Sequence, residues 1–169
     1  MKSSFVFFTL IAFVSAGSLR QKRAPQNGVR RGGQTIVLKE VGGIPGNECM
    51  TFTNAGQAVN AACVNTAADR QVTPSTINGK NVLLIQRSFT AGFRRDLVNK
   101  QACLASNGQT LLAQDCATAN DLVSLAGDKL VAASGACHKG HNGNAQMTVD
   151  PAGKSCARVT STRVAATPP

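Results

Sequence analysis

Two histidines, His138 and His141, stand three positions apart beside Cys137 in the sequence CHKGH. Such a pair can be half of a zinc site, because Zn²⁺ takes imidazole nitrogens together with thiolate or carboxylate ligands. The surrounding stretch is rich in Gly and Asn, and the first carboxylate that follows is Asp150. We therefore expect a solvent-exposed polar loop here, with neither a metal nor another cofactor.

Groups that could catalyse a reaction are few. The sequence has no G-x-S-x-G nucleophile motif. Asp115 and Asp121 stand at turn positions, where carboxylates ordinarily bind backbone N–H groups. We predict that the protein is not an enzyme.

The six cysteines fall into three close pairs, Cys49 with Cys63, Cys103 with Cys116, and Cys137 with Cys156. An even number of cysteines in a secreted chain indicates disulfides rather than metal or redox chemistry. The sequence has three similar units, which begin at Gly33, Gly79 and Gly127, and each contains one of these pairs. We therefore predict that the two cysteines within each unit are bonded to each other. Each bridge would stabilise the fold by about 3 kcal/mol by restricting the unfolded chain.

The start of the chain has the anatomy of a secretory signal peptide. Lys2 precedes an apolar run at residues 5–14, and the small residues of VSAG follow, so residues 1–16 are expected to be removed. Lys22 and Arg23 form a dibasic pair of the kind that kexin-type proteases cut, which makes residues 17–23 a pro-segment. Removal of 23 residues from 169 leaves 146, enough for one domain. We predict a secreted, extracellular protein without a membrane span.

Positive charge is scattered over the mature chain. The precursor has a net charge of +10, and loss of four basic residues with the leader reduces it to +6. The chain has no Trp or Tyr on which bases could stack. We predict no nucleic-acid partner.

Three apolar runs recur after glycine. GQTIVL begins at Gly33, GKNVLLI at Gly79 and GDKLVAAS at Gly127, so the glycines are 46 and 48 residues apart. Short runs with turn signals predict an all-β fold, and no window has the apolar spacing of a helix. A single unit could not bury its apolar face, so we expect three units to close around one core with pseudo-threefold symmetry.

The second unit resembles the repeat of ricin-type β-trefoil lectin domains. The matching stretch is NKQACLASNGQTLLAQDCATANDLVSLAGDKLVAASGAC at 99–137. In it, Cys103-Leu104 matches the family's G-x-C-L strand, Asp115-Cys116 its D-C ending, and ANDLV at 119–123 its N-Q-x-W turn; Val72 and Val123 stand at the tryptophan position as smaller core residues. The resemblance implies a β-trefoil at 34–164, one disulfide in each of its three repeats, an N-terminal tail at 24–33 and a C-terminal tail at 165–169.

The resemblance also implies a carbohydrate site in each unit. The family has an Asp two residues after the first Cys, where this chain has Thr51, Ala105 and Lys139. No aromatic residue stands before any second Cys, and only Asn120 keeps the family's turn amide, with Asp121 beside it and Asp69 in the equivalent turn of the first unit. We therefore predict that amides and carboxylates bind an extracellular or cell-surface glycan. The predicted ligand-binding residues are Asn120, Asp121, Asp69 and Asn107.

An alternative function comes from residues 85–100, which lengthen the second unit and place Phe89 and Phe93 near Arg94 and Arg95. Both phenylalanines could fill the core. Alternatively, Phe93, Arg94 and Arg95 could bind a host or cell-wall protein, because aromatic and Arg side chains anchor many interfaces. The protein would then be a secreted effector, a toxin-like factor or an inhibitor that presents Arg to a trypsin-like protease. In either case we expect a monomer, and the dibasic pro-segment with small disulfide-bearing repeats is typical of fungal secreted proteins.

Overall fold

The computed structural model describes residues 29–168, which form short β-strands and two single-turn 3-10 helices. The strands are β1 (Val29–Arg31), β2 (Ile36–Glu40), β3 (Glu48–Phe52), β4 (Ala58–Ala62), β5 (Gln71–Ile77), β6 (Lys80–Ile85), β7 (Ala102–Ser106), β8 (Leu111–Asp115), β9 (Val123–Ala126), β10 (Lys129–Ala132), β11 (Cys137–His141), β12 (Met147–Asp150) and β13 (Val159–Arg163). The helices are η1 (Ala68–Arg70) and η2 (Arg95–Leu97). The predicted all-β class is therefore confirmed, and the three runs after glycine are β2, β6 and β10.

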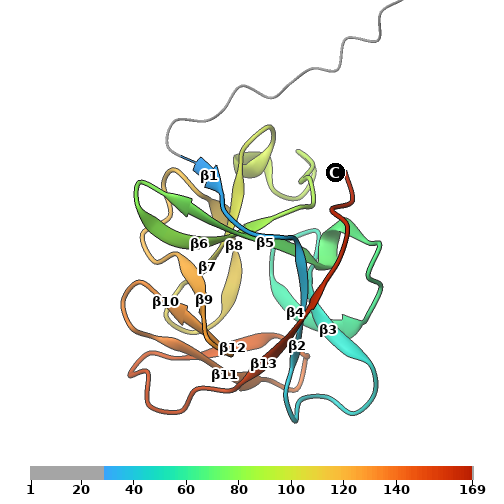
Figure 1. Cartoon of the computed structure of the whole chain (residues 1–169), viewed down its shortest axis with the longest axis vertical. Helices are drawn as coiled ribbons and strands as arrows, with labels where there is room; N and C mark the ends of the chain where they lie inside the picture. The colour runs from blue at the N-terminus through green and yellow to red at the C-terminus, as the bar shows by residue number, and fades with distance from the viewer. Residues whose placement is uncertain (1–28, 169) are drawn as a thin grey trace, which may run out of the picture.

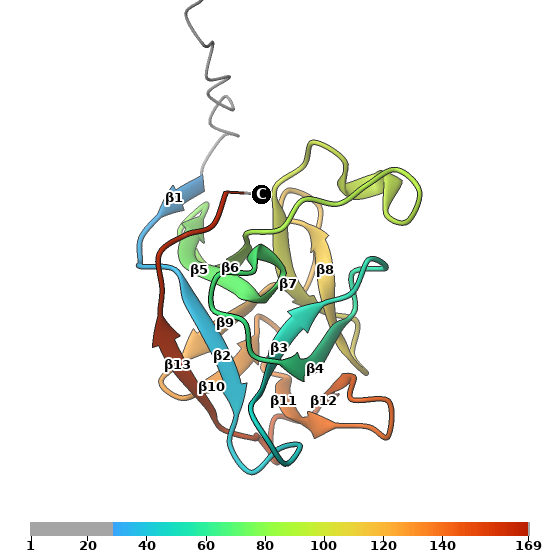
Figure 2. The same cartoon turned by 90° about the vertical axis from the view of Figure 1, so that its right-hand side faces the viewer.

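All strand pairs are antiparallel, and the strands group into three sheets of unequal size. The largest has the order β13-β2-β5-β6-β7-β8, with β1 also paired to β5. A second sheet has the order β12-β11-β10-β9, and β3 pairs with β4 alone. The sheets therefore do not divide the chain into three equal units. Figures 1 and 2 show β2 and β13, from opposite ends of the described chain, side by side.

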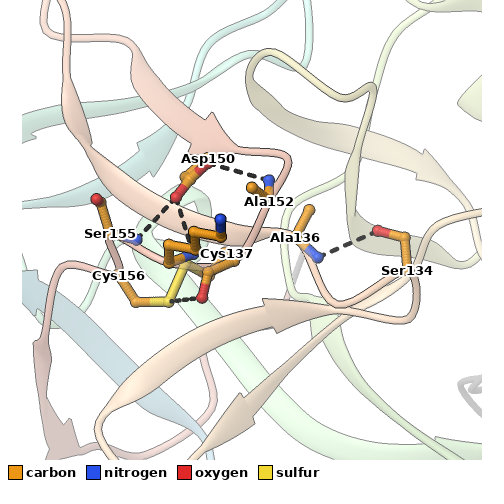
Figure 3. Close-up of a disulfide and its surroundings, with 9 residues drawn as sticks. Ser134, Ala136, Cys137, Asp150, Ala152, Ser155 and Cys156 are labelled. Carbon is orange, nitrogen blue, oxygen red and sulfur yellow. Dashed lines mark hydrogen bonds between the residues drawn. A yellow bond between two sulfur atoms is a disulfide. The ribbon is translucent and has the colours of Figure 1, made fainter.

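Three hairpins, β3–β4, β7–β8 and β11–β12, each have one disulfide. The bonds join Cys49 to Cys63, Cys103 to Cys116 and Cys137 to Cys156. Each bond links the first strand of a hairpin to residues that follow its second strand, which confirms the predicted pairing of nearest neighbours. In the third hairpin, Asp150 lies close to the bridge and its carboxylate accepts hydrogen bonds from the backbone N–H groups of Ala152 and Ser155 (Figure 3).

The core explains why the strand sequences are apolar over several successive residues. On β6, Leu83 and Ile85 belong to the main hydrophobic core, whereas Val82 and Leu84 pack on the other face against the Cys103–Cys116 bridge. A strand buried on both faces gains from apolar residues at every position. Val72 and Val123, which were expected in the core, are both fully buried there.

The two ends of the described chain are attached to the sheet. Residues 29–31, in the predicted N-terminal tail, form β1 and pair with β5. The predicted C-terminal tail is held by Gln71, whose Oε1 accepts a hydrogen bond from the Thr167 N–H and whose Nε2 donates to the Thr167 hydroxyl. The predicted signal peptide, the pro-segment and residues 24–28 lie outside the described residues. Neither helix between residues 29 and 168 is long and apolar enough to span a membrane.

Candidate functional site

A cavity of about 570 Å³ lies along the β7–β8 hairpin, and we call it the polar hollow. Its walls come from the end of β7, the β7–β8 turn, the end of β8, the turn before β9 and the loop before η2. The lining residues are Arg94, Asp96, Ser106, Asn107, Gly108, Gln114, Asp115, Thr118, Ala119, Asn120 and Asp121. The structure thus brings together three of the four predicted ligand-binding residues.

The β7–β8 turn places Asn107 at the hollow. The Oδ1 atom of Asn107 accepts hydrogen bonds from the backbone N–H groups of Gln109 (3.0 Å) and Thr110 (2.8 Å). An Asn that binds the backbone ahead of it in this way stabilises a tight turn. The carbonyl oxygen of this amide is therefore occupied by the turn, and its nitrogen is the atom that could donate to a ligand.

Asn120 and Asp121 differ in the hydrogen bonds that their side chains form with the rest of the protein. The Asp121 carboxylate accepts hydrogen bonds from the backbone N–H (2.8 Å) and hydroxyl (3.0 Å) of Ser134, which ties this turn to the loop between β10 and β11. Asn120 is exposed, and no hydrogen bond joins its amide to another described residue. Asn120 is therefore the freer of the two to bind a ligand, while Asp121 also positions the wall.

Arg94 forms part of the wall from a different direction. Its guanidinium donates two hydrogen bonds to the Asp96 carboxylate, at 2.8 and 2.6 Å, and one to the Ala113 carbonyl at 3.0 Å. The hydrogen bond from Arg94 is the main cause that lowers the pKa of Asp96 below its ordinary value. Arg94 also lies so close to Gly56, in the β3–β4 turn, that a Cβ atom at residue 56 would collide with its Nη1. The first hairpin therefore helps to hold the loop that borders the hollow.

The charge of the hollow is opposite to that of the chain. Its lining has three carboxylates, from Asp96, Asp115 and Asp121, and one guanidinium, from Arg94. Lys100 lies 3.8 Å from Asp115 and reduces this excess only in part, since its side chain is half exposed. The chain as a whole has a net charge of +10. The hollow is thus suited to neutral or cationic groups that donate hydrogen bonds.

Of the other predicted site residues, Asp69, Phe93 and Arg95 lie outside the hollow. Asp69 is on η1, where its carboxylate pairs with Arg70 at 2.8 Å. Phe93 is 63% exposed and Arg95 is also exposed, whereas Phe89 is buried in the core. Of the two phenylalanines that could have filled the core, only Phe89 does so. Arg94, predicted as part of a protein-binding surface, instead lies in the wall of the hollow.

The expectation of a solvent-exposed loop around His138 is wrong. His138 is fully buried on β11, and its ring lies 3.6 Å from the carboxylate of Glu40 on β2. The nearby carboxylate comes from a residue almost a hundred positions earlier, so a search along the local sequence could not find it. Within residues 29–168, no group of three or more His, Cys, Asp or Glu side chains is arranged to hold a metal ion.

Sequence reasoning also missed several lining residues, among them Ser106, Gln114 and Asp96. Ser106 precedes Asn107 in the chain, so its place beside Asn107 follows from the β7–β8 turn, whereas Gln114 pairs with Cys103 toward the other end of the hairpin. No comparable signal exists for Asp96, because its position depends on the path of a long loop.

No protein-family model, curated protein or solved structure matches this chain. The function must therefore be argued from the chemistry of the hollow.

Proposed function

We propose that the protein is a secreted, non-catalytic carbohydrate-binding module whose binding site is the polar hollow. The observation that carries this proposal is the convergence of Asn107, Asn120 and Asp121 on one cavity of about 570 Å³. Amide and carboxylate groups fix the hydroxyl groups of a sugar through directional hydrogen bonds. The hollow is large enough for one or two sugar residues of an extracellular glycan.

A β-trefoil architecture of the ricin type is part of this proposal. Strands β13, β2, β5 and β6 pair in succession, β6 packs against β9, and β9 pairs with β10. A bridge between Lys129 and Arg158 brings the chain just before β13 back to β10. The six strands β2, β5, β6, β9, β10 and β13 thus follow one another in a cyclic order. One disulfide-bonded hairpin follows β2, another follows β6 and the third follows β10, so each unit has four strands. This arrangement supports the trefoil. The strand β1 is then an addition to it.

The lining predicts which sugars bind. It contains no aromatic ring, so stacking on the apolar face of a sugar does not contribute to affinity as it does in many lectins. Hydrogen bonding must carry recognition, and the excess of carboxylates disfavours acidic sugars. We expect neutral or amine-bearing glycans to bind in the hollow, and any capture of acidic glycans to come from the basic surface and to weaken with salt.

A glycan array tests the proposal. The chain from residue 24 is applied to chitin, glucan, mannan and galactoside probes at low and at physiological salt. We expect binding that survives physiological salt and falls at least tenfold in Asn120→Ala. The matched control is Asn144→Ala, because Asn144 is equally exposed but lies on the β11–β12 hairpin. Absence of salt-resistant binding, or an equal loss in both variants, would refute the hollow as a sugar site.

A protein partner is the second candidate, and the exposure of Phe93 favours it. A phenylalanine that is 63% exposed beside an exposed Arg95 has the composition of an interface anchor. Arg94 is held by Asp96 and by the Ala113 carbonyl, so only Arg95 is free to enter a trypsin-like pocket. A trypsin inhibition assay with Arg95→Ala tests the inhibitor form. If the wild-type protein does not inhibit trypsin, the inhibitor hypothesis is refuted. A pull-down that compares the wild type with Phe93→Ala tests the effector hypothesis.

A further inference from the structure

A cluster of polar side chains is buried between the first and third hairpins, away from the polar hollow. Its centre is the Glu40 carboxylate at the end of β2, whose side chain is 7% exposed. The Oε2 atom of Glu40 accepts a hydrogen bond from Asn60 Nδ2 at 2.9 Å and lies 3.1 Å from His141 Nδ1. His138 Nε2 lies 3.6 Å from the same oxygen. We call these four residues the Glu40 cluster.

A bulge in β11 brings both histidines to Glu40. Residues three apart in a regular strand point to opposite faces, because side chains alternate. In β11 the pairing with β12 shifts between His138 and Gly140, which inserts one extra residue, Lys139, into the strand. A β-bulge of this kind turns the side chains that follow it to the other face. His138 and His141 therefore lie on the same side, toward β2.

The burial of His138 is compensated only in part. Its side chain is fully buried, and neither ring nitrogen has a hydrogen-bond partner among the described residues. Burial lowers the pKa of His138 below its ordinary value of 6.5, and the negative charge of Glu40 and the backbone of Gly140 oppose this effect only in part. The other charged group that acts on the ring is His141, on the same strand, and a proton on His141 disfavours a second one on His138. Asn60, from β4, is polar but uncharged.

The Glu40 cluster joins elements that are distant in sequence. Glu40 belongs to β2, Asn60 to β4 and the histidines to β11. The backbone continues the contact, since the Asn60 N–H donates to the Ala145 carbonyl in the β11–β12 turn at 2.8 Å. The cluster therefore holds the third hairpin against the first. The Cys137–Cys156 bond lies within the third hairpin and its flank, so it keeps that hairpin closed without attaching it to β2 or β4.

We propose that the Glu40 cluster is an acid-operated latch, in which protonation of His138 releases the β11–β12 hairpin from β2 and β4. Protonation would place a positive charge on a ring from which water is excluded, and the Glu40 carboxylate at 3.6 Å and the backbone of Gly140 stabilise this charge only in part. Burial of a charge without full compensation is costly. In the open hairpin, water would solvate the imidazolium ring. Protons therefore bind more tightly to the open state than to the closed state, and acid favours opening.

The direction and range of this pH dependence follow from linkage. In the open state His138 titrates near 6.5, and in the closed state it titrates lower. The latch is thus fully closed above about pH 6.5. As the pH decreases below this value, the free energy that keeps the hairpin closed decreases, until the pH reaches the pKa of His138 in the closed state. One proton that binds only to the open state raises the opening equilibrium about tenfold per pH unit in this range.

Amide hydrogen exchange on the whole protein between pH 7.5 and 4.5 tests the latch. After correction for the intrinsic pH dependence of exchange, we expect the opening of β11 and β12 amides to increase up to about tenfold per pH unit below pH 6.5. The internal control is the set of β7–β8 amides away from Gln109 and Thr110, the two turn residues that contact β12. This hairpin has no histidine, and these amides should keep constant protection. In His138→Leu, whose side chain does not titrate, the β11–β12 opening should no longer depend on pH.

Three results would overturn the proposal. Wild-type β11–β12 amides could show no increase in opening, the increase could be equal in the β7–β8 hairpin, or it could persist in His138→Leu. If the leucine variant does not fold, His138→Gln provides the same test with a polar side chain. The comparison of the two hairpins within the wild-type protein is decisive without any variant.

Discussion

The contact between Gly56 and Arg94 leads to a sharp prediction about stability. Gly56 has φ +79°, and a Cβ atom at this position would collide with Arg94 Nη1. Gly79, in the β5–β6 turn, has the same φ of +79° but nothing within 4 Å of its Cβ position. The pair Gly56→Ala and Gly79→Ala therefore separates backbone strain from loss of the Arg94 contacts.

The expected magnitudes follow from the two contributions. An L-residue in the left-handed region costs about 1–2 kcal/mol, and both variants incur this cost. In Gly56→Ala the Nη1 atom of Arg94 must also shift, which weakens its hydrogen bonds to the carbonyls of Ala113 (3.0 Å) and Ala55 (3.3 Å), and hydrogen bonds of charged groups contribute about 1.5–3 kcal/mol. We therefore expect the free energy of unfolding to fall by about 2 kcal/mol more in Gly56→Ala than in Gly79→Ala.

Urea unfolding followed by circular dichroism at neutral pH measures both values. The same substitution is then made in an Arg94→Ala background, where the collision no longer exists. There the cost of Gly56→Ala should fall to that of Gly79→Ala, which is the coupling that a double-mutant cycle detects. Equal costs for the two glycine variants in the wild-type background would refute the claim that the first hairpin holds Arg94 in place.

Two further predictions concern the hairpins. The pKa of Asp150 is lowered mainly by hydrogen bonds from the backbone N–H groups of Ser155 and Ala152, so its contribution to stability is present above about pH 3.8 and is lost as the pH falls through the folded-state value. The thermal midpoint should therefore decline less between pH 4 and pH 2 in Asp150→Asn than in wild type, and parallel curves would contradict this role. Removal of the second disulfide by Cys103→Ser with Cys116→Ser should lower the free energy of unfolding in urea by about 3 kcal/mol, because it frees a loop of 13 residues. A loss below 1 kcal/mol would mean that packing alone holds this hairpin.

The sequence predicted those parts of the fold that depend on local patterns. The runs at β2 and β6 are continuous and apolar because successive residues on both faces are buried, and in β10 Leu130 and Ala132 are buried while Val131 is partly exposed. This signal does not require knowledge of distant residues. The disulfides were predictable for the same reason, since each joins the two sides of one hairpin. Asn107, Asn120 and Asp121 lie within or next to the β7–β8 hairpin, so their convergence depends on few long-range contacts.

The features that the sequence did not predict depend on contacts between distant segments. His138 stands in a polar, glycine-containing stretch, and its burial results from the bulge at Lys139 and from Glu40 on another strand. The Lys-Gly pair after His138 was the available signal, because a glycine inside a strand often marks a bulge. The location of Arg94 depends on the β3–β4 turn, almost forty residues earlier, and nothing near Arg94 in the sequence indicates it.

The pairing of β13 with β2, together with the hydrogen bonds between Thr167 and Gln71, has a consequence for the order of folding. During synthesis each disulfide hairpin emerges complete, since its cysteines are 13 to 19 residues apart, and can oxidise while the rest is still being made. The main sheet cannot acquire β13 until residues 159–163 have emerged from the ribosome. Contacts between residues so far apart form slowly. A nascent chain is therefore expected to hold three locally bonded hairpins first, and residues 159–168 join the main sheet afterwards.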